Sequence, residues 1–128
     1  MLLVRVFLGL LGLAWLGFGV WCFSDPDYLR DLAGVTYVSV TGRVDLVATY
    51  GGLLIAIAMC LLAGALNRHL TRAVLIFYGV ICAGLGCARL AGAVLEAEWS
   101  SYTVIGIGFE LGSVLFVLLL LHRARSVH

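Results

Sequence analysis

The chain has 128 residues, of which 63% are hydrophobic and 12% are charged, and its formal net charge is +1. Soluble domains are about half apolar and about a quarter charged, so this composition excludes a water-soluble globular protein and indicates side chains that face lipid. The sequence contains no basic patch of the kind that binds phosphates, so we expect no nucleic-acid partner.

Four apolar stretches predict four membrane-spanning helices. Each stretch has about the 20 residues that a helix needs to cross about 30 Å of hydrocarbon, and only a helix satisfies its own backbone in lipid. The predicted helices cover residues 2–23, 46–66, 70–95 and 102–122. Because the last two connections allow only tight turns, the sequence predicts an all-α fold: a single integral membrane domain, residues 1–128, forming an up-down-up-down four-helix bundle.

The N-terminal stretch is predicted to be a retained helix. Its apolar run is longer than that of a typical signal peptide, and no small-residue cleavage site follows it.

Residues 24–45 form the one long segment outside the predicted membrane spans. Within it, Asp25-Pro26 and Gly34 predict the beginning and end of a short helix, Pro26–Ala33. Residues 35–40 alternate apolar and polar side chains, which is compatible with a strand-like lid, although an ordered interfacial loop is the favoured interpretation.

The arginines predict the orientation in the membrane. One side carries five arginines and the three histidines but no acid, while the other side carries three arginines with all seven acids. Positive side chains stay in the cytoplasm, so we expect a multi-pass protein of the inner membrane with cytoplasmic N- and C-termini, His128 included, and residues 24–45 outside.

Small side chains recur at helical spacing on the second and third predicted helices. Such stripes let membrane helices approach closely, since lipid supplies no hydrophobic drive for packing. The close-packing candidates are Gly51, Gly52, Ala56, Gly79 and Ala83. Contact between the second and third helices is favoured, and a dimer face is the alternative.

Two ionisable residues fall inside predicted spans. Arg89 precedes the end of the third helix by about two turns, and Glu110 follows the start of the fourth by about the same distance. Ionisable groups in lipid are costly and face a partner, so these two side chains, at matching depth on antiparallel neighbours, are predicted to pair.

A second polar cluster opens the second helix. Asp45 and Thr49 share a face at i, i+4, with Arg43 just before them. Tyr50 lies about 7 Å further along the axis than Asp45, so its hydroxyl is predicted to join the Arg89–Glu110 network.

These motifs resemble a family of small bacterial four-helix membrane proteins, known as a domain of unknown function and akin to the DoxX-like proteins. The shared features are Tyr50-Gly51-Gly52 opening the second helix, the Gly86-Cys87-Ala88-Arg89-Leu90 run and Glu110. The family pattern has its arginine three residues before the tyrosine, where this chain has Val47. The resemblance implies the architecture and no particular activity.

Two classes of function remain open. The first is a non-catalytic protein that binds membrane lipid or an apolar small molecule (lipid, quinone or isoprenoid) in an outward-facing pocket, or that serves as an accessory subunit of a larger membrane complex. A homo-oligomer is the alternative assembly. The second is a small membrane enzyme acting on an amphipathic substrate at the outer leaflet. For the Arg89–Glu110 pair itself, a buried structural clasp between the third and fourth helices is the favoured interpretation, and the outward-facing polar pocket is the alternative.

No catalytic residue, metal site or cofactor is predicted. The histidines lack ligand spacing, and the four cysteines contain no CxxC pair, so we interpret them as packing residues.

Overall fold

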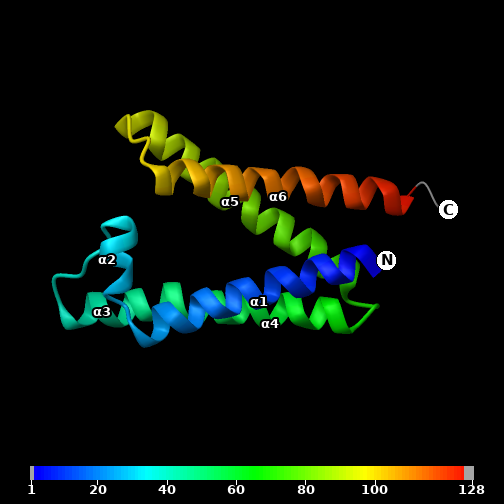
Figure 1. Ribbon diagram of the computed structural model, residues 1–128, viewed down its shortest axis with the longest axis horizontal. Coiled ribbons are helices and arrows are strands. Elements are labelled where there is room, and N and C mark those ends of the chain that lie inside the picture. The colour runs from blue at the N-terminus through cyan, green and yellow to red at the C-terminus, as the bar shows by residue number, and fades with distance from the viewer. Residues whose placement is uncertain (1, 126–128) are drawn as a thin grey trace. The chain divides into compact units, whose positions relative to one another are not determined.

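The computed structural model describes residues 2–125; Met1 and residues 126–128, and with them the predicted cytoplasmic His128, lie outside the described residues. The described chain is helical and contains no β-strand. Its elements are α1 (Leu2–Ser24), α2 (Tyr28–Ala33), α3 (Val40–Leu46), the π-helix η1 (Val47–Leu53), α4 (Leu54–Leu66), α5 (Thr71–Glu96) and α6 (Ser101–Arg125) (Figure 1). They form two compact units, Leu2–Thr71 and the chain from Arg72 onward.

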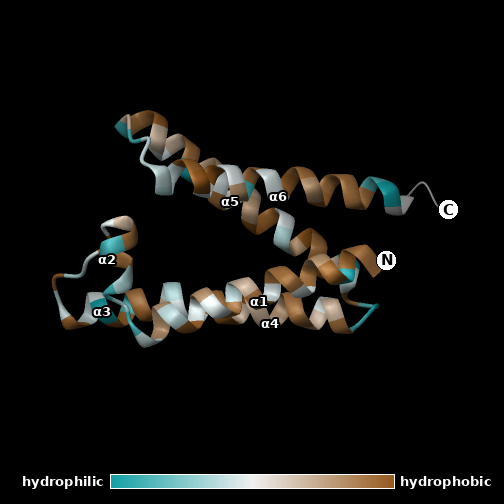
Figure 2. Cartoon of the chain, viewed as in Figure 1, coloured by the Kyte–Doolittle hydropathy of each residue, from teal (hydrophilic) through white to brown (hydrophobic). Residues whose placement is uncertain are grey.

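Four helical segments are long and apolar enough to cross a membrane. They are Leu2–Ser24, Val40–Leu66, Thr71–Glu96 and Ser101–Arg123. In the most apolar 18 residues of each segment, only 22–28% are buried within the protein. Most of these apolar side chains therefore need another apolar environment, which lipid provides. Figure 2 shows hydrophobic residues along most of the length of the long helices and hydrophilic residues mainly near the helix ends. The predicted all-α membrane fold is confirmed.

The first unit is an antiparallel hairpin of α1 against η1 and α4. Two glycines of α1 allow the close approach: a Cβ on Gly12 would lie 2.8 Å from the Leu62 side chain, and one on Gly19 would lie 3.0 Å from the Ile55 backbone nitrogen. Arg5 donates a 2.7 Å hydrogen bond from Nε to the last-turn carbonyl of Ala65, a carbonyl with no intrahelical partner. Sequence analysis did not single out Gly12 and Gly19.

The connection between α1 and α3 differs from the prediction. A short helix, α2, is present, but it begins at Tyr28 rather than at the predicted Pro26. It is followed as predicted by Gly34, whose φ of 69° is the left-handed conformation that glycine adopts at helix ends. The strand-like alternative for residues 35–40 is wrong: Ser39 caps α3 by accepting a 3.0 Å hydrogen bond from the Gly42 amide, so helical structure begins at Val40. The second membrane span therefore begins six residues before the predicted residue 46.

The middle of this span is a π-helix. Its seven residues include Gly51, where a Cβ would lie 2.9 Å from the Phe23 Cα and 2.8 Å from its Cβ. The end of α1 thus touches the π-helix backbone, and only glycine leaves room for that contact.

The second unit is the hairpin of α5 and α6. Its turn contains Ala97, with a φ of 52°, followed by a capping arrangement at the start of α6. The Glu98 carboxylate accepts a 2.9 Å hydrogen bond from the Ser100 amide and a second from the Thr103 hydroxyl. These hydrogen bonds, that of Thr103 first, lower the pKa of Glu98, because both donors stabilise its ionised form.

The helix bounds of the second unit lie close to those expected. For α5, residues 70–95 were predicted and Thr71–Glu96 is observed. For α6, residues 102–122 were predicted and Ser101–Arg125 is observed. The packing of the two hairpins into a single four-helix bundle stays a prediction.

Candidate functional site

Arg89 and Glu110 form the predicted ion pair across the α5–α6 interface. The guanidinium holds both carboxylate oxygens, with Nη2 donating to Oε1 at 2.9 Å and Nε donating to Oε2 at 3.0 Å. Bidentate charge-assisted hydrogen bonds of this kind are the strong ones. The two partners differ in exposure, since 30% of the Arg89 side chain is accessible but only 7% of the Glu110 side chain.

Glycines make room for this pair on both helices. A Cβ on Gly106 would lie 2.9 Å from the Arg89 Nε, so the guanidinium crosses α6 where that helix has no side chain. A Cβ on Gly86 would lie 2.7 Å from the Leu111 side chain and 3.2 Å from the Glu110 Cβ. The absence of side chains at these two positions brings the helices close enough for a direct ion pair.

An aromatic ring borders the guanidinium. The Cζ of Arg89 lies 5.6 Å from the centre of the Tyr102 ring, within the range of a cation–π interaction. Sequence analysis did not predict this contact between Tyr102 and Arg89.

Polar contacts continue along the same interface beyond Glu110. The Tyr78 hydroxyl donates a 3.2 Å hydrogen bond to the Ser113 hydroxyl, and both residues are buried. The buried Cys82 thiol lies beside these two hydroxyls. From Tyr78 to Arg89 the polar line covers about 16 Å along α5.

Sequence analysis missed Tyr78 and Ser113 and treated Cys82 as a packing residue. A signal was present: positions 78, 82 and 89 share one face of α5 at i, i+4 and i+11, and Ser113 lies at i+3 from Glu110.

The second predicted polar cluster lies in the other structural unit. Arg43, Asp45 and Thr49 are exposed on α3 and η1. Tyr50 is half-buried and packs against an apolar cluster of Cys22, Leu29 and Leu46. The proposed link from Tyr50 to the Arg89–Glu110 pair stays a prediction.

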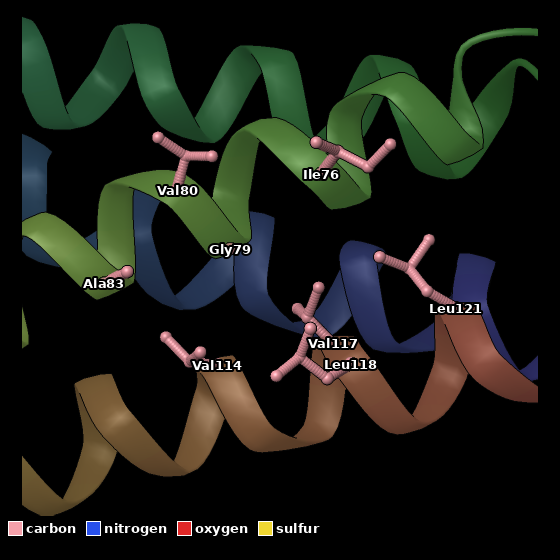
Figure 3. A pocket seen from close by; sticks show the side chains of 8 residues that line it. All are labelled: Ile76, Gly79, Val80, Ala83, Val114, Val117, Leu118 and Leu121. Atoms are coloured by element: carbon pink, nitrogen blue, oxygen red, sulfur yellow. The ribbon is translucent and has the colours of Figure 1, made fainter.

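The predicted close-packing residues have different surroundings. Gly51 lies against Phe23, and a Cβ on Gly79 would lie 3.0 Å from the Val117 side chain. Nothing lies within 4 Å of a Cβ placed on Gly52, and Ala56 is exposed. Ala83 borders an apolar groove between α5 and α6 (Figure 3). Contact between the second and third membrane spans stays a prediction.

Among the described residues, no group of three histidine, cysteine, aspartate or glutamate side chains lies close enough to hold a metal ion.

The helices and the ion pair define a class: an α-helical membrane protein with four spanning-length helices and an arginine–glutamate ion pair between α5 and α6. The chain belongs to DUF4345, a family described as a domain of unknown function, whose model matches residues 3–121. No curated protein and no solved structure matches the chain.

Proposed function

We propose that this protein is a non-catalytic membrane protein that binds an amphipathic ligand, with the ligand's polar head at the Arg89–Glu110 pair. The observation that carries the proposal is the unequal burial of the pair: Glu110 is buried, whereas 30% of the Arg89 side chain remains accessible. A guanidinium that stays partly accessible can contact a further molecule, whereas a fully enclosed ion pair cannot.

The guanidinium has donors to spare for such a ligand. Arginine carries five N–H groups, and Glu110 accepts from the edge formed by Nε and Nη2. The remaining N–H groups suit an oxygen atom of a bound molecule, and the Tyr102 ring centre lies 5.6 Å from the guanidinium carbon. The flanking spans supply apolar surface, as ligand sites with a few polar groups in apolar walls require. Lipids, quinones and isoprenoids fit this description.

The proposal is tested by analysing the molecules that copurify with the protein. Full-length chain is extracted in mild detergent, and bound molecules are identified by mass spectrometry from the wild type and from the double variant Arg89→Gln/Glu110→Gln. Replacing both charges leaves neither one unpaired, so this double variant is expected to fold. The matched control is Arg30→Gln/Asp31→Asn, which removes an exposed ion pair with an N–O distance of 3.5 Å.

A defined small molecule present in the wild type and the control but lost from the double variant supports the binding site. Equal amounts of bound molecule in all three proteins, or none in any, contradict it. Co-purification of a stable protein partner in place of a small molecule would favour the accessory-subunit function.

The proposal includes an orientation. The charge distribution supports cytoplasmic termini in an inner membrane, with the Arg89 end of α5 towards the outside. Single cysteines introduced at Asn67 and Ser100, in a chain without its native cysteines, are expected to react with a membrane-impermeant maleimide from inside and from outside respectively. The reverse labelling pattern would overturn this orientation. We also propose that the chain is akin to the DoxX-like proteins; the motifs around Tyr50, Arg89 and Glu110 support this proposal.

A further inference from the structure

Three residues on one face of α6 surround the Arg89 guanidinium. Positions 102, 106 and 110 recur at i, i+4 and i+8, which places them on the same side of the helix. The Tyr102 ring centre lies 5.6 Å from the Arg89 Cζ, and a Cβ on Gly106 would lie 3.1 Å from that same carbon. Glu110 accepts hydrogen bonds of 2.9 and 3.0 Å. The guanidinium therefore lies across Gly106, with the aromatic ring one turn before it and the carboxylate one turn after it.

The ion pair alone does not fix the guanidinium. Glu110 is buried, but 30% of the Arg89 side chain is accessible, so water and lipid head groups compete with the carboxylate for its N–H groups. Arginine also has a large rotamer entropy, which is lost when the side chain is held in one conformation. Because the face of an aromatic ring attracts a guanidinium electrostatically, Tyr102 stabilises the conformation in which Arg89 lies beside it.

The place of Tyr102 depends on the turn between α5 and α6 (Figure 1). Tyr102 is the second residue of α6, and the first turn of a helix has backbone N–H groups without intrahelical partners. The Ser100 hydroxyl accepts a 3.4 Å hydrogen bond from the Thr103 amide, while the Glu98 carboxylate accepts hydrogen bonds from the Ser100 amide and the Thr103 hydroxyl. We call Glu98, Ser100 and Thr103 the turn cap. Its members hold the chain on both sides of Tyr102.

The turn cap is itself tied to α5. The Glu98 amide donates a 3.0 Å hydrogen bond to the carbonyl of Ala93, a buried residue. Ala93 lies one helical turn after Arg89, on the same face of α5. A closed series of contacts therefore runs from Arg89 along α5 to Ala93, through the turn cap to Tyr102, and back to the guanidinium. Loosening the turn cap is expected to move the Tyr102 ring relative to the guanidinium.

We infer that Tyr102, held in place by the turn cap, is a positioning residue for the ligand site: it keeps the Arg89 guanidinium against Glu110, where the head group of the ligand meets it. The ligand part of this inference rests on the proposed function, whereas the position of the guanidinium is a property of the chain alone. Glu98 and Ser100 lie between the spanning segments, so residues outside those segments help to hold a site within them.

The first test measures how fast the Arg89 Nε–H proton exchanges with water. Full-length protein containing isotopically labelled arginine is studied by nuclear magnetic resonance in lipid nanodiscs, and the Arg89 signal is assigned by its loss in Arg89→Lys. The wild type should exchange slowly, because this N–H donates to Glu110. Tyr102→Leu is expected to raise the rate about fivefold, while Tyr102→Phe, which keeps the ring, should stay close to the wild type. An unchanged rate in Tyr102→Leu would overturn the inference.

A fluorination series separates the electrostatic role of the ring from its shape. Position 102 is given phenylalanine carrying no, one, two or three fluorine atoms, which withdraw electron density from the ring face and change its size little. The Arg89 exchange rate should rise with each fluorine, because the attraction between ring and cation weakens. Equal rates across the series would mean that the ring only fills space, which contradicts the inference. Since these rings differ little in shape, a folding defect in Tyr102→Leu would not remove the test.

The turn cap is tested by removing and restoring one hydroxyl group. Thr103→Val has nearly the same shape but cannot bind Glu98, so it should raise the Arg89 exchange rate and reduce the copurified molecule. Thr103→Ser keeps the hydroxyl and should restore both. The matched control is Thr71→Val, which removes a buried 2.8 Å hydrogen bond to the Gly64 carbonyl at the other end of α5. Equal exchange rates in Thr103→Val and Thr71→Val would overturn the role of the turn cap.

The results distinguish this inference from the proposed function. The exchange measurement needs no ligand, so it decides whether Tyr102 positions the guanidinium even if no molecule copurifies with the wild type and the proposed function fails. Conversely, a copurified molecule that is lost from Arg89→Gln/Glu110→Gln but retained by Tyr102→Leu and Thr103→Val supports the binding site and overturns the positioning role.

Discussion

Removing Arg89 alone is expected to destabilise the α5–α6 hairpin strongly. In Arg89→Ala the Glu110 carboxylate, whose residue is 5% exposed, stays buried but loses its hydrogen bonds to the guanidinium and the positive charge beside it. Breaking a buried pair by removing one partner costs about 3–5 kcal/mol. Because 30% of the Arg89 side chain is accessible, solvent screens part of the interaction, and we expect the lower end, about 3 kcal/mol.

The comparison variant is Arg30→Ala. Arg30 pairs with Asp31 at 3.5 Å, but the two side chains are 59% and 78% exposed. Exposed pairs contribute about 0–1 kcal/mol, so this change should be nearly silent. Reversible unfolding in mixed micelles, followed by circular dichroism at increasing denaturing detergent, measures both free energies of unfolding.

The double variant Arg89→Gln/Glu110→Gln completes the experiment. If the loss in Arg89→Ala comes from a stranded carboxylate, neutralising both partners should recover most of it. Equal free energies of unfolding for Arg89→Ala and Arg30→Ala would refute the buried-pair argument.

Three further predictions follow from contacts in the structure. Gly51→Ala is expected to lower the free energy of unfolding by about 1–3 kcal/mol, because the new methyl group would overpack against the α1 backbone. Gly52→Ala has open space around the new Cβ and should be neutral or slightly stabilising. Equal free energies of unfolding for the two variants would contradict this prediction. Gly106→Ala should displace the guanidinium and reduce the copurified ligand, whereas Gly108→Ala should not, as measured by the same mass spectrometry. Because the pKa of Glu98 is lowered in the folded chain, its ionised carboxylate stabilises the fold at pH values above 4.5, the ordinary pKa of glutamate. This stabilisation is lost as the pH falls through the lowered pKa. The difference in melting temperature between the wild type and Glu98→Gln should therefore shrink as the pH falls below 4.5, and a difference that grows there would contradict the assigned capping role.

The membrane-spanning elements could be predicted because their cause is local. A stretch of about 20 apolar residues must be helical in lipid whatever surrounds it, and so residues 2–23 compare closely with the observed Leu2–Ser24. The beginning of the second span was predicted less well. Thr41, Arg43 and Asp45 lower the hydropathy of this segment and hide a helix that starts at Val40. The Ser39 cap is a local signal that hydropathy does not measure.

The Arg89–Glu110 pair was also predictable, because two ionisable groups at equal depth on adjacent antiparallel helices have few other partners. The other contacts of the second hairpin were not. Tyr78 and Ser113 are ordinary residues in the sequence, and their hydrogen bond depends on how α5 is rotated against α6.

The sequence by itself therefore determined the four spanning helices and the buried charges, since both follow from the free energy of placing each residue in lipid. Only the tertiary structure decided which faces meet. The rotation and closeness of neighbouring helices depend on where glycines such as Gly12, Gly86 and Gly106 leave room for a particular partner side chain. That fit is a property of two surfaces together, and neither helix alone specifies it.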